Sequence, residues 1–261
     1  MKQSSQIELI DELLALAEGI AQRAGELLSE RPENFDINQK SSARDFATHM
    51  DHASEKLIVS AILAARPDDG IIGEEGANRE SESGITWVID PIDGTVNYFY
   101  NLPGWNISIA AKDAQGVLIG VVYAPTLNSL WHASRGGGAF LNDRPIHVST
   151  ADALEDSLIA TGFSYDLAER VRQGEQIAAL IPRVRDIRRN GAAAVDLCHV
   201  ASGAVDGYFE TGLKEWDLAA GGLIAREAGA LVTGRKGAPA GEAMVIAAGA
   251  ALHALLLEEI G

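Results

Sequence analysis

The chain has 261 residues, 47% of them hydrophobic, and a formal net charge of −16 at pH 7. This length and composition predict a globular protein with a sizeable core, built as one large domain or as two closely packed halves. The acidic balance, with no long run of Lys or Arg, argues against nucleic acid as the main partner.

The N-terminal segment 1–19 carries acidic residues inside its apolar stretch and has no small-residue cleavage site, so it predicts an amphipathic helix and not a signal peptide. No run approaches about 18 uninterrupted apolar residues, the length needed to span a membrane. The single cysteine, Cys198, cannot form an internal disulfide and is expected to be a small buried residue. We expect a cytoplasmic protein with no membrane partner.

Helical periodicity predicts a first helix from Ile7 to Leu28 and a second from about Asp45 to Ala65, joined by a loop from Asn38 to Arg44. From Gly70 onward the pattern predicts short strands in an antiparallel meander, at residues 71–72, 85–89, 105–111, 116–123, 129–133 and 139–141. The glycines at 136–138 could cradle a phosphate. They lack the Lys and the following helix of a P-loop, so a hairpin turn is the favoured interpretation.

Beyond Asp152 strands alternate with helices, which implies a sheet covered by helices. The expected strands are 157–161, 184–188, 205–210, 230–233 and 243–247, and the expected helices are 167–180, 191–202, 217–228 and 250–258. No internal repeat or long linker is visible. We therefore expect an N-terminal half, residues 1–150, and a C-terminal half, residues 151–261, that form one compact unit.

The stretch from Trp87 to Tyr98 concentrates the chemistry. Strand-prone residues lead into Asp90 and Asp93, which flank Pro91, and then into Gly94-Thr95, a turn and a plausible helix N-cap. Because Pro91 stiffens the turn, the two carboxylates and the Ile92 carbonyl can converge on Mg²⁺. Asp-Pro and Asp-Gly are also ordinary turn formers, so this segment alone leaves both interpretations open.

Two other acidic segments could present a carboxylate to the same cleft. Glu74-Glu75 follows a short apolar run, and Asp217 stands at the predicted start of a helix. Taken singly, a solvated turn and an N-cap are the favoured interpretations.

Taken together, the segments GEE, WVIDPIDGTVNY and WDLAAG resemble the signatures of the inositol monophosphatase family, which are Mg²⁺-dependent, lithium-sensitive phosphatases. The segments occur in the family's order and at family-like separations, and the resemblance extends from Lys40 to the region of Gly229. It implies an α+β fold, the layered α-β-α-β-α sandwich of the family, and usually a homodimer.

Carried over residue by residue, the resemblance assigns two sets of metal ligands. Glu74, Asp90 and the Ile92 carbonyl would bind the first Mg²⁺, and Asp90, Asp93 and Asp217 the second. A third, weaker ion is described near Glu74, which gives two to three ions in all. Most of these ligands lie in the N-terminal half, and the C-terminal half would complete the site.

The resemblance also implies the remaining roles. Thr95, helped by Asp51, would orient the attacking water, and Glu74 is counted with them as catalytic. The Gly94 and Thr95 amides would receive the phosphate, Glu210 would accept a hydrogen bond from a substrate hydroxyl, and Ala193 lies in the small-residue run that approaches the polyol ring.

Three positions qualify the match. Ala192 stands where many members have Ser or Thr, which leaves the substrate's identity open, and Ala47 replaces a β-branched residue, a change expected to be harmless. Lys40 matches a lysine of a mobile loop on the metal side, although a solvated lysine is an equal alternative.

Other metal and phosphatase chemistries fit less well. His49 and His52 lack a third clear ligand for a transition metal, so a solvated helix face is favoured. A haloacid-dehalogenase-type site needs aspartates two positions apart, where Ile92 stands. A cysteine phosphatase needs an arginine six residues after Cys198, where the chain has Ala204.

The expected function is hydrolysis of a small polyol phosphate, most of all inositol 1-phosphate, by in-line attack of a metal-activated water. The same chemistry on histidinol phosphate, fructose 1,6-bisphosphate or a 3′-phosphoadenosine nucleotide is the alternative. A regulatory binding protein for a partner such as the transcription machinery, as some bacterial relatives are, is the alternative from another class. The intact carboxylates favour catalysis.

Overall fold

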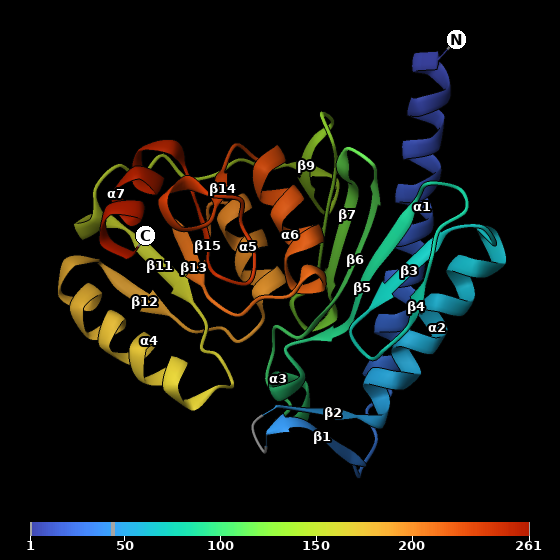
Figure 1. Ribbon diagram of the computed structural model, residues 1–261, viewed down its shortest axis with the longest axis horizontal. Helices are drawn as coiled ribbons and strands as arrows, with labels where there is room; N and C mark the ends of the chain where they lie inside the picture. Colours follow the sequence, from blue (N-terminus) through green and yellow to red (C-terminus); the bar gives the residue numbers. More distant parts are fainter. Residues whose placement is uncertain (1, 43–44, 261) are drawn as a thin grey trace.

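The computed structural model describes residues 2–42 and 45–260, and five layers follow one another across it: helices, sheet, helices, sheet, helices (Figure 1). This confirms the α+β, α-β-α-β-α sandwich. The helices are α1 (Lys2–Ser29), α2 (His49–Ala65), α3 (Thr95–Phe99), α4 (Leu167–Leu180), α5 (Ala193–Ala201), α6 (Glu215–Glu227) and α7 (Ala250–Ile260). Short 3-10 turns occupy Pro125–Leu127, Leu154–Asp156, Ile181–Arg183 and Arg235–Gly237.

The larger sheet has eight strands in the order β10-β9-β8-β7-β6-β5-β3-β4. They are β3 (Gly70–Gly73), β4 (Asn78–Arg79), β5 (Thr86–Asp93), β6 (Asn106–Asp113), β7 (Gly116–Ala124), β8 (Ser129–Ser134), β9 (Gly138–Leu141) and β10 (Arg144–Pro145). From β5 to β10 neighbours are antiparallel, as predicted. The meander is wrong for β3, which runs parallel to β5, because β4 and the following loop carry the chain back before β5 begins.

The smaller sheet has the order β12-β11-β13-β15-β14. Its strands are β11 (Leu158–Thr161), β12 (Asp186–Arg188), β13 (Gly207–Glu210), β14 (Leu231–Thr233) and β15 (Val245–Ala248). As expected, helices cover it, and α4 matches the predicted 167–180. The expected division into halves at residue 150 stays a prediction.

Three apolar cores lie between the layers. One packs α1 and α2 against the larger sheet through residues such as Ile20, Ile58 and Trp87. The central core surrounds α5 and α6 and includes Trp131 and Tyr208, and the third joins the smaller sheet to α4 and α7. Because α5 and α6 pack between the two sheets, residues of the N-terminal half and of the C-terminal half meet at the N-terminal ends of these two helices.

The N-terminal connection corrects two predictions. Residues 38–42, expected in a loop, belong to β1 (Ile37–Ser42), which pairs with β2 (Asp45–Thr48), and residues 43–44 lie outside the described residues. The second helix therefore begins at His49 and not at Asp45. Thr48 stops it from starting earlier: its extended backbone and its hydroxyl, which accepts from the Met50 N–H, make it the N-cap of α2.

The glycines at 136–138 form the expected turn between β8 and β9. The amides of Gly136 and Gly138 donate to the Glu227 carboxylate at 2.9 and 3.0 Å. The anion-binding capacity of this loop is therefore used by a side chain of α6.

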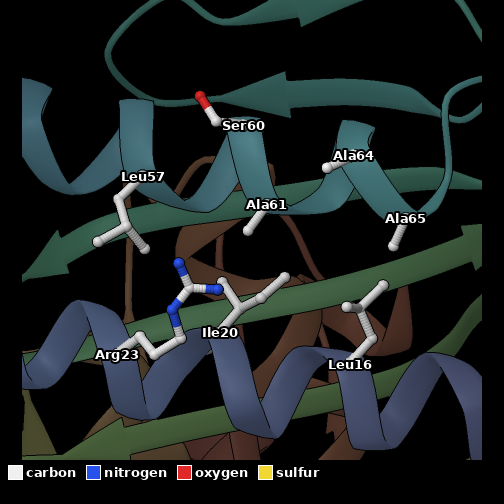
Figure 2. A pocket seen from close by; sticks show the side chains of 8 residues that line it. All are labelled: Leu16, Ile20, Arg23, Leu57, Ser60, Ala61, Ala64 and Ala65. Carbon is white, nitrogen blue, oxygen red and sulfur yellow. The ribbon is translucent and has the colours of Figure 1, made fainter.

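No helix among the described residues is long and apolar enough to cross a membrane. Short side chains leave a shallow hollow of about 530 Å³ between α1 and α2, and Figure 2 shows Leu16, Ile20 and Arg23 of α1 facing Leu57 and Ala61 of α2. Its lining contains no carboxylate, so it offers nothing to hold a hard cation.

Candidate active site

The end of β5 delivers the central carboxylates. Trp87 and Ile89 are fully buried and anchor the strand, and the pairing of β5 with β6 shifts register between Asp90 and Asp93. Such irregularities re-aim side chains. The turn beyond them requires glycine, since Gly94 has φ +85° and a Cβ there would lie 3.1 Å from the Ala192 Cβ.

Four carboxylates act on one another at this point. Burial raises the pKa of Asp90 well above its ordinary value, and repulsion from Glu74, Asp93 and Asp217 raises it further. Burial also raises the pKa of each of those three groups. The four acidic side chains that the resemblance assigns to metals are thus close enough for their negative charges to repel one another.

Asp93 is held from two other elements. Its Oδ2 accepts from the Asn106 side-chain amide and from the Ala194 N–H, both at 2.8 Å, and its Oδ1 accepts from the Ala193 N–H at 3.2 Å. Asp93 thereby ties β5 to the start of α5. Asn106, which is fully buried, was not predicted, because its role comes from the pairing of β6 with β5 opposite Asp93.

Asp51 and Thr95 are brought together although they lie 44 positions apart. The Thr95 hydroxyl lies 3.1 Å from the Asp51 Oδ1 and 3.1 Å from the Ile92 carbonyl oxygen, and its single proton serves one of them at a time. The other oxygen of Asp51 accepts from the Thr48 N–H and hydroxyl, each at 2.7 Å. Burial raises the pKa of Asp51 to about 6.

Lys40 is exposed, yet its ammonium pairs with two carboxylates. Its ammonium donates to the Glu74 Oε1 at 2.8 Å and also pairs with Glu75. Burial lowers the pKa of Lys40, but the nearby charges and hydrogen bonds of Glu74 and Glu75 outweigh it and raise that pKa above its ordinary value.

Asp217 lies inside α6, not at its N-cap as its position first suggests. The helix begins at Glu215, and the Asp217 Oδ2 accepts from the Lys214 N–H at 2.6 Å. This bond closes the first turn of α6, and the charge of Asp93 adds to the effect of burial on the Asp217 pKa.

A cavity of about 440 Å³ extends from Asp93 and Gly94 to Glu210, with Ala193 and Asp217 on its walls. Burial raises the pKa of Glu210 to about 7, and the Tyr208 hydroxyl donates to it at 2.6 Å. Gly162 is needed beside it, because a Cβ there would overlap the Glu210 carboxylate.

Two cations on the cavity wall, Arg189 and Lys214, were not predicted. Lys214 is paired with Glu242, whereas no hydrogen bond or ion pair within the described residues holds the Arg189 guanidinium. A short polar segment after a strand gives little signal for such a role.

The donor set suits Mg²⁺, which prefers carboxylate and carbonyl oxygens and retains several waters. A buried Asp90 repelled by three carboxylates would be stabilised by a cation. Within residues 2–42 and 45–260, however, no three His, Cys, Asp or Glu side chains lie close enough to share one ion. Backbone amides and Lys40 engage several of these oxygens, so the two assigned ligand sets stay predictions.

Residues set aside by the sequence also lie outside this cluster. The His49 Nδ1 accepts from the Asp36 N–H, and the His52 ring is about half exposed, 3.6 Å from a Glu75 oxygen. Cys198 is fully buried in the central core, where burial raises the pKa of its thiol.

The layered sandwich and the acidic pocket between its two sheets are those of a phosphatase class. The chain belongs to the inositol monophosphatase family, whose model matches residues 9–261. The resemblance carried by the three sequence segments is thereby confirmed, and the family is generally Mg²⁺-dependent.

Particular relatives carry two kinds of name. The Nus factor SuhB of Haemophilus influenzae is 42% identical over 224 residues, 84% of each protein. The extragenic suppressor protein suhB of Bartonella henselae matches with a TM-score of 0.90 and 33% identity, over 95% of this chain and 98% of that one. The IMPase of Thermotoga maritima matches with a TM-score of 0.88 and 33% identity, over 95% and 96%.

Proposed function

We propose that this chain is a Mg²⁺-dependent phosphomonoesterase that hydrolyses a small polyol phosphate, inositol 1-phosphate above all. The observation that carries the proposal is the convergence of Glu74, Asp90, Asp93 and Asp217 beside the Gly94-Thr95 turn, at one end of a cavity that reaches Glu210. Such an arrangement can hold cations and a phosphate at one point and an alcohol at the other.

The carboxylates and the Ile92 carbonyl oxygen are the groups that would hold Mg²⁺. When bound, the ions supply Lewis-acid chemistry: they lower the pKa of water and neutralise charge on the phosphoryl oxygens. Because α3 has only five residues, the phosphate would depend on the local Gly94 and Thr95 amides more than on a long helix dipole.

Thr95 and Asp51 would position the water. A Thr95 hydroxyl that donates to Asp51 keeps its lone pairs free to accept a hydrogen bond from the nucleophile. The water attacks phosphorus from the side opposite the ester oxygen, and the bond between phosphorus and the ester oxygen breaks. One water is consumed, and the alcohol and inorganic phosphate are released. The ionised form of Asp51 is the one that accepts.

The far end of the cavity supports a polyol as the leaving group. Glu210, with a pKa of about 7, can accept a hydrogen bond from a hydroxyl or donate one to it. The small residues Gly191, Ala192 and Ala193 form one wall of the cavity without a side-chain donor, so recognition would depend on the side chains of the other walls, which include Glu210, Arg189 and Lys214.

The test is phosphate release from inositol 1-phosphate, histidinol phosphate, fructose 1,6-bisphosphate and a 3′-phosphoadenosine nucleotide under Mg²⁺ titration, with lithium as inhibitor. Asp93→Asn is the inactive variant, and Asp152→Asn, an exposed aspartate, is the matched control. The proposal predicts the highest kcat/KM on inositol 1-phosphate. The proposal is wrong if no substrate releases phosphate at millimolar Mg²⁺, or if Asp93→Asn is as active as the parent.

The names of the relatives support a second candidate, a regulatory role beside or in place of catalysis. The net charge of −16 disfavours direct binding to nucleic acid, so the partner would be a protein of the transcription machinery. Binding of purified RNA polymerase, measured for the parent and for Asp93→Asn, separates the two. Equal binding with catalysis abolished would establish a role independent of hydrolysis, and absence of binding would remove this candidate.

A further inference from the structure

Glu55 of α2 is a buried carboxylate, 7% exposed, that the steps above do not use. It accepts two backbone hydrogen bonds from the turn between β3 and β4: from the Glu75 N–H at 2.9 Å and from the Ala77 N–H at 3.1 Å. The side chain therefore fills the inside of the turn that carries Glu74.

The turn is shaped to receive this carboxylate. The Gly73 amide donates to the Ala77 carbonyl at 2.7 Å, which closes the turn, and Gly76 adopts φ +105°. A Cβ on Gly73 would overlap the Glu55 carboxylate, so the glycine leaves the space that Glu55 occupies. The Glu74 amide donates to the Ile89 carbonyl of β5 at 3.2 Å, which fixes the other side of the turn.

The same helix also contacts the segment from Trp87 to Tyr98, at two points. Asp51 accepts from Thr95, the Ser54 hydroxyl donates to the Pro91 carbonyl at 3.0 Å, and Glu55 holds the turn after β3. Because residues i and i+4 share a helix face, Asp51 and Glu55 point the same way from α2. One face of this helix thus contacts both N-terminal segments assigned to the site, at three points.

We propose that Glu55 is a positioning residue that sets where the Glu74 carboxylate lies relative to Asp90, and thereby sets the affinity of the site for Mg²⁺. This rests on the proposed function of Glu74 as a metal ligand. Residues that orient a metal ligand typically change metal affinity or activity by about 10–100-fold when mutated.

The test compares four variants: Glu55→Gln, Glu55→Ala, Gly73→Ala and, as a control, Glu80→Gln, which removes one negative charge from an exposed position after β4. Gln keeps one acceptor oxygen and the shape of Glu, and Gly73→Ala displaces the Glu55 carboxylate without changing it. Two midpoints are measured against Mg²⁺ concentration, one for phosphate release and one for the rise in melting temperature.

Glu55→Gln and Gly73→Ala are expected to raise both Mg²⁺ midpoints by about tenfold, and Glu55→Ala by more. At saturating Mg²⁺ the KM for substrate stays within about twofold, since the turn does not line the substrate cavity. Glu80→Gln matches the parent. Hydrogen exchange over residues 74–78 is faster in Glu55→Ala, because two amides lose their acceptor.

Parent-like midpoints in Glu55→Gln and Gly73→Ala overturn the proposal, whether or not Glu55→Ala folds. Failure of the proposed function has a different signature: no variant releases phosphate, yet the Mg²⁺ midpoint of the melting temperature still shifts, and the positioning role stands. A parent whose melting temperature does not respond to Mg²⁺ would overturn both.

Discussion

The two ends of the candidate active site are built differently. At the proposed phosphate end, Asp51 and Asp93 each have three hydrogen-bond donors within 2.7–3.2 Å, and three of these six donors are backbone amides. At the proposed leaving-group end, Tyr208 is the one donor to Glu210 among the described residues, and no hydrogen bond or ion pair within them fixes Arg189. We infer from this difference that the groups proposed for phosphate chemistry are preorganised, whereas those proposed to contact the alcohol retain freedom.

The largest effect is expected from breaking the phosphate end. Asp90→Asn should reduce kcat/KM for inositol 1-phosphate by at least about 10²–10³-fold, the scale for removing a group that acts on transition-state charge. The same variant should melt at least about 2 °C higher than the metal-free parent, because it relieves the repulsion between the buried Asp90 and its three neighbouring carboxylates. Asp152→Asn should change neither quantity. An Asp90→Asn variant that is both active and no more stable would contradict this description.

Thr95→Ala tests the water-positioning pair and should reduce kcat by about 10²-fold or more. The pH profile of kcat/KM gives the second readout. Since the Asp51 pKa is about 6 and its ionised form accepts, activity should fall as the pH drops through about 6. Asp51→Asn should remove this acid limb together with most of the activity. An unchanged acid limb in Asp51→Asn would assign it to another group.

A smaller and more selective effect is expected at the leaving-group end. Glu210→Gln, and Gly162→Ala through displacement of Glu210, should raise the KM for inositol 1-phosphate by about tenfold, the equivalent of one hydrogen bond. Hydrolysis of p-nitrophenyl phosphate, which has no hydroxyls on its leaving group, should change by less than about twofold. Equal losses on both substrates would show that the two ends are not separable.

The smallest effect concerns stability and pH. Burial raises the folded-state pKa of Asp51 to about 6 and of Glu210 to about 7, above the unfolded values near 3.8 and 4.5. The contribution of these two groups to the stability of the folded protein is therefore fully present below about pH 4 and is lost as the pH rises through 6–7. The metal-free protein should melt a few degrees higher at pH 5.5 than at pH 8. Saturating Mg²⁺ should reduce this difference, and a metal-free protein that is more stable at pH 8 would contradict it.

The sequence singled out the carboxylates of the proposed phosphate end because they lie in short segments where residue type and order are informative, and their roles stay predictions. Asp90, Asp93 and Gly94 lie within five consecutive positions directly after strand-prone residues. The helices of the C-terminal half show a clear helical periodicity.

What could not be predicted depends on contacts between distant segments. In the sequence Glu55 cannot be told from other helical glutamates, because its two hydrogen bonds come from backbone amides of the turn after β3. Asn106 acts through its pairing opposite Asp93. The start of α2 was misplaced because Asp45 fits a helical period but is used in a hairpin. Local sequence patterns do not predict such contacts between distant segments.

The most direct test of the central claim is a crystal structure of the chain with Mn²⁺ in place of Mg²⁺, examined for anomalous scattering at the manganese edge. We expect a peak bonded to the Asp90 carboxylate, either with Glu74 and the Ile92 carbonyl or with Asp93 and Asp217, and no such peak in Asp90→Asn. A peak only at other carboxylates, or none at Asp90 with millimolar Mn²⁺ present, would contradict it.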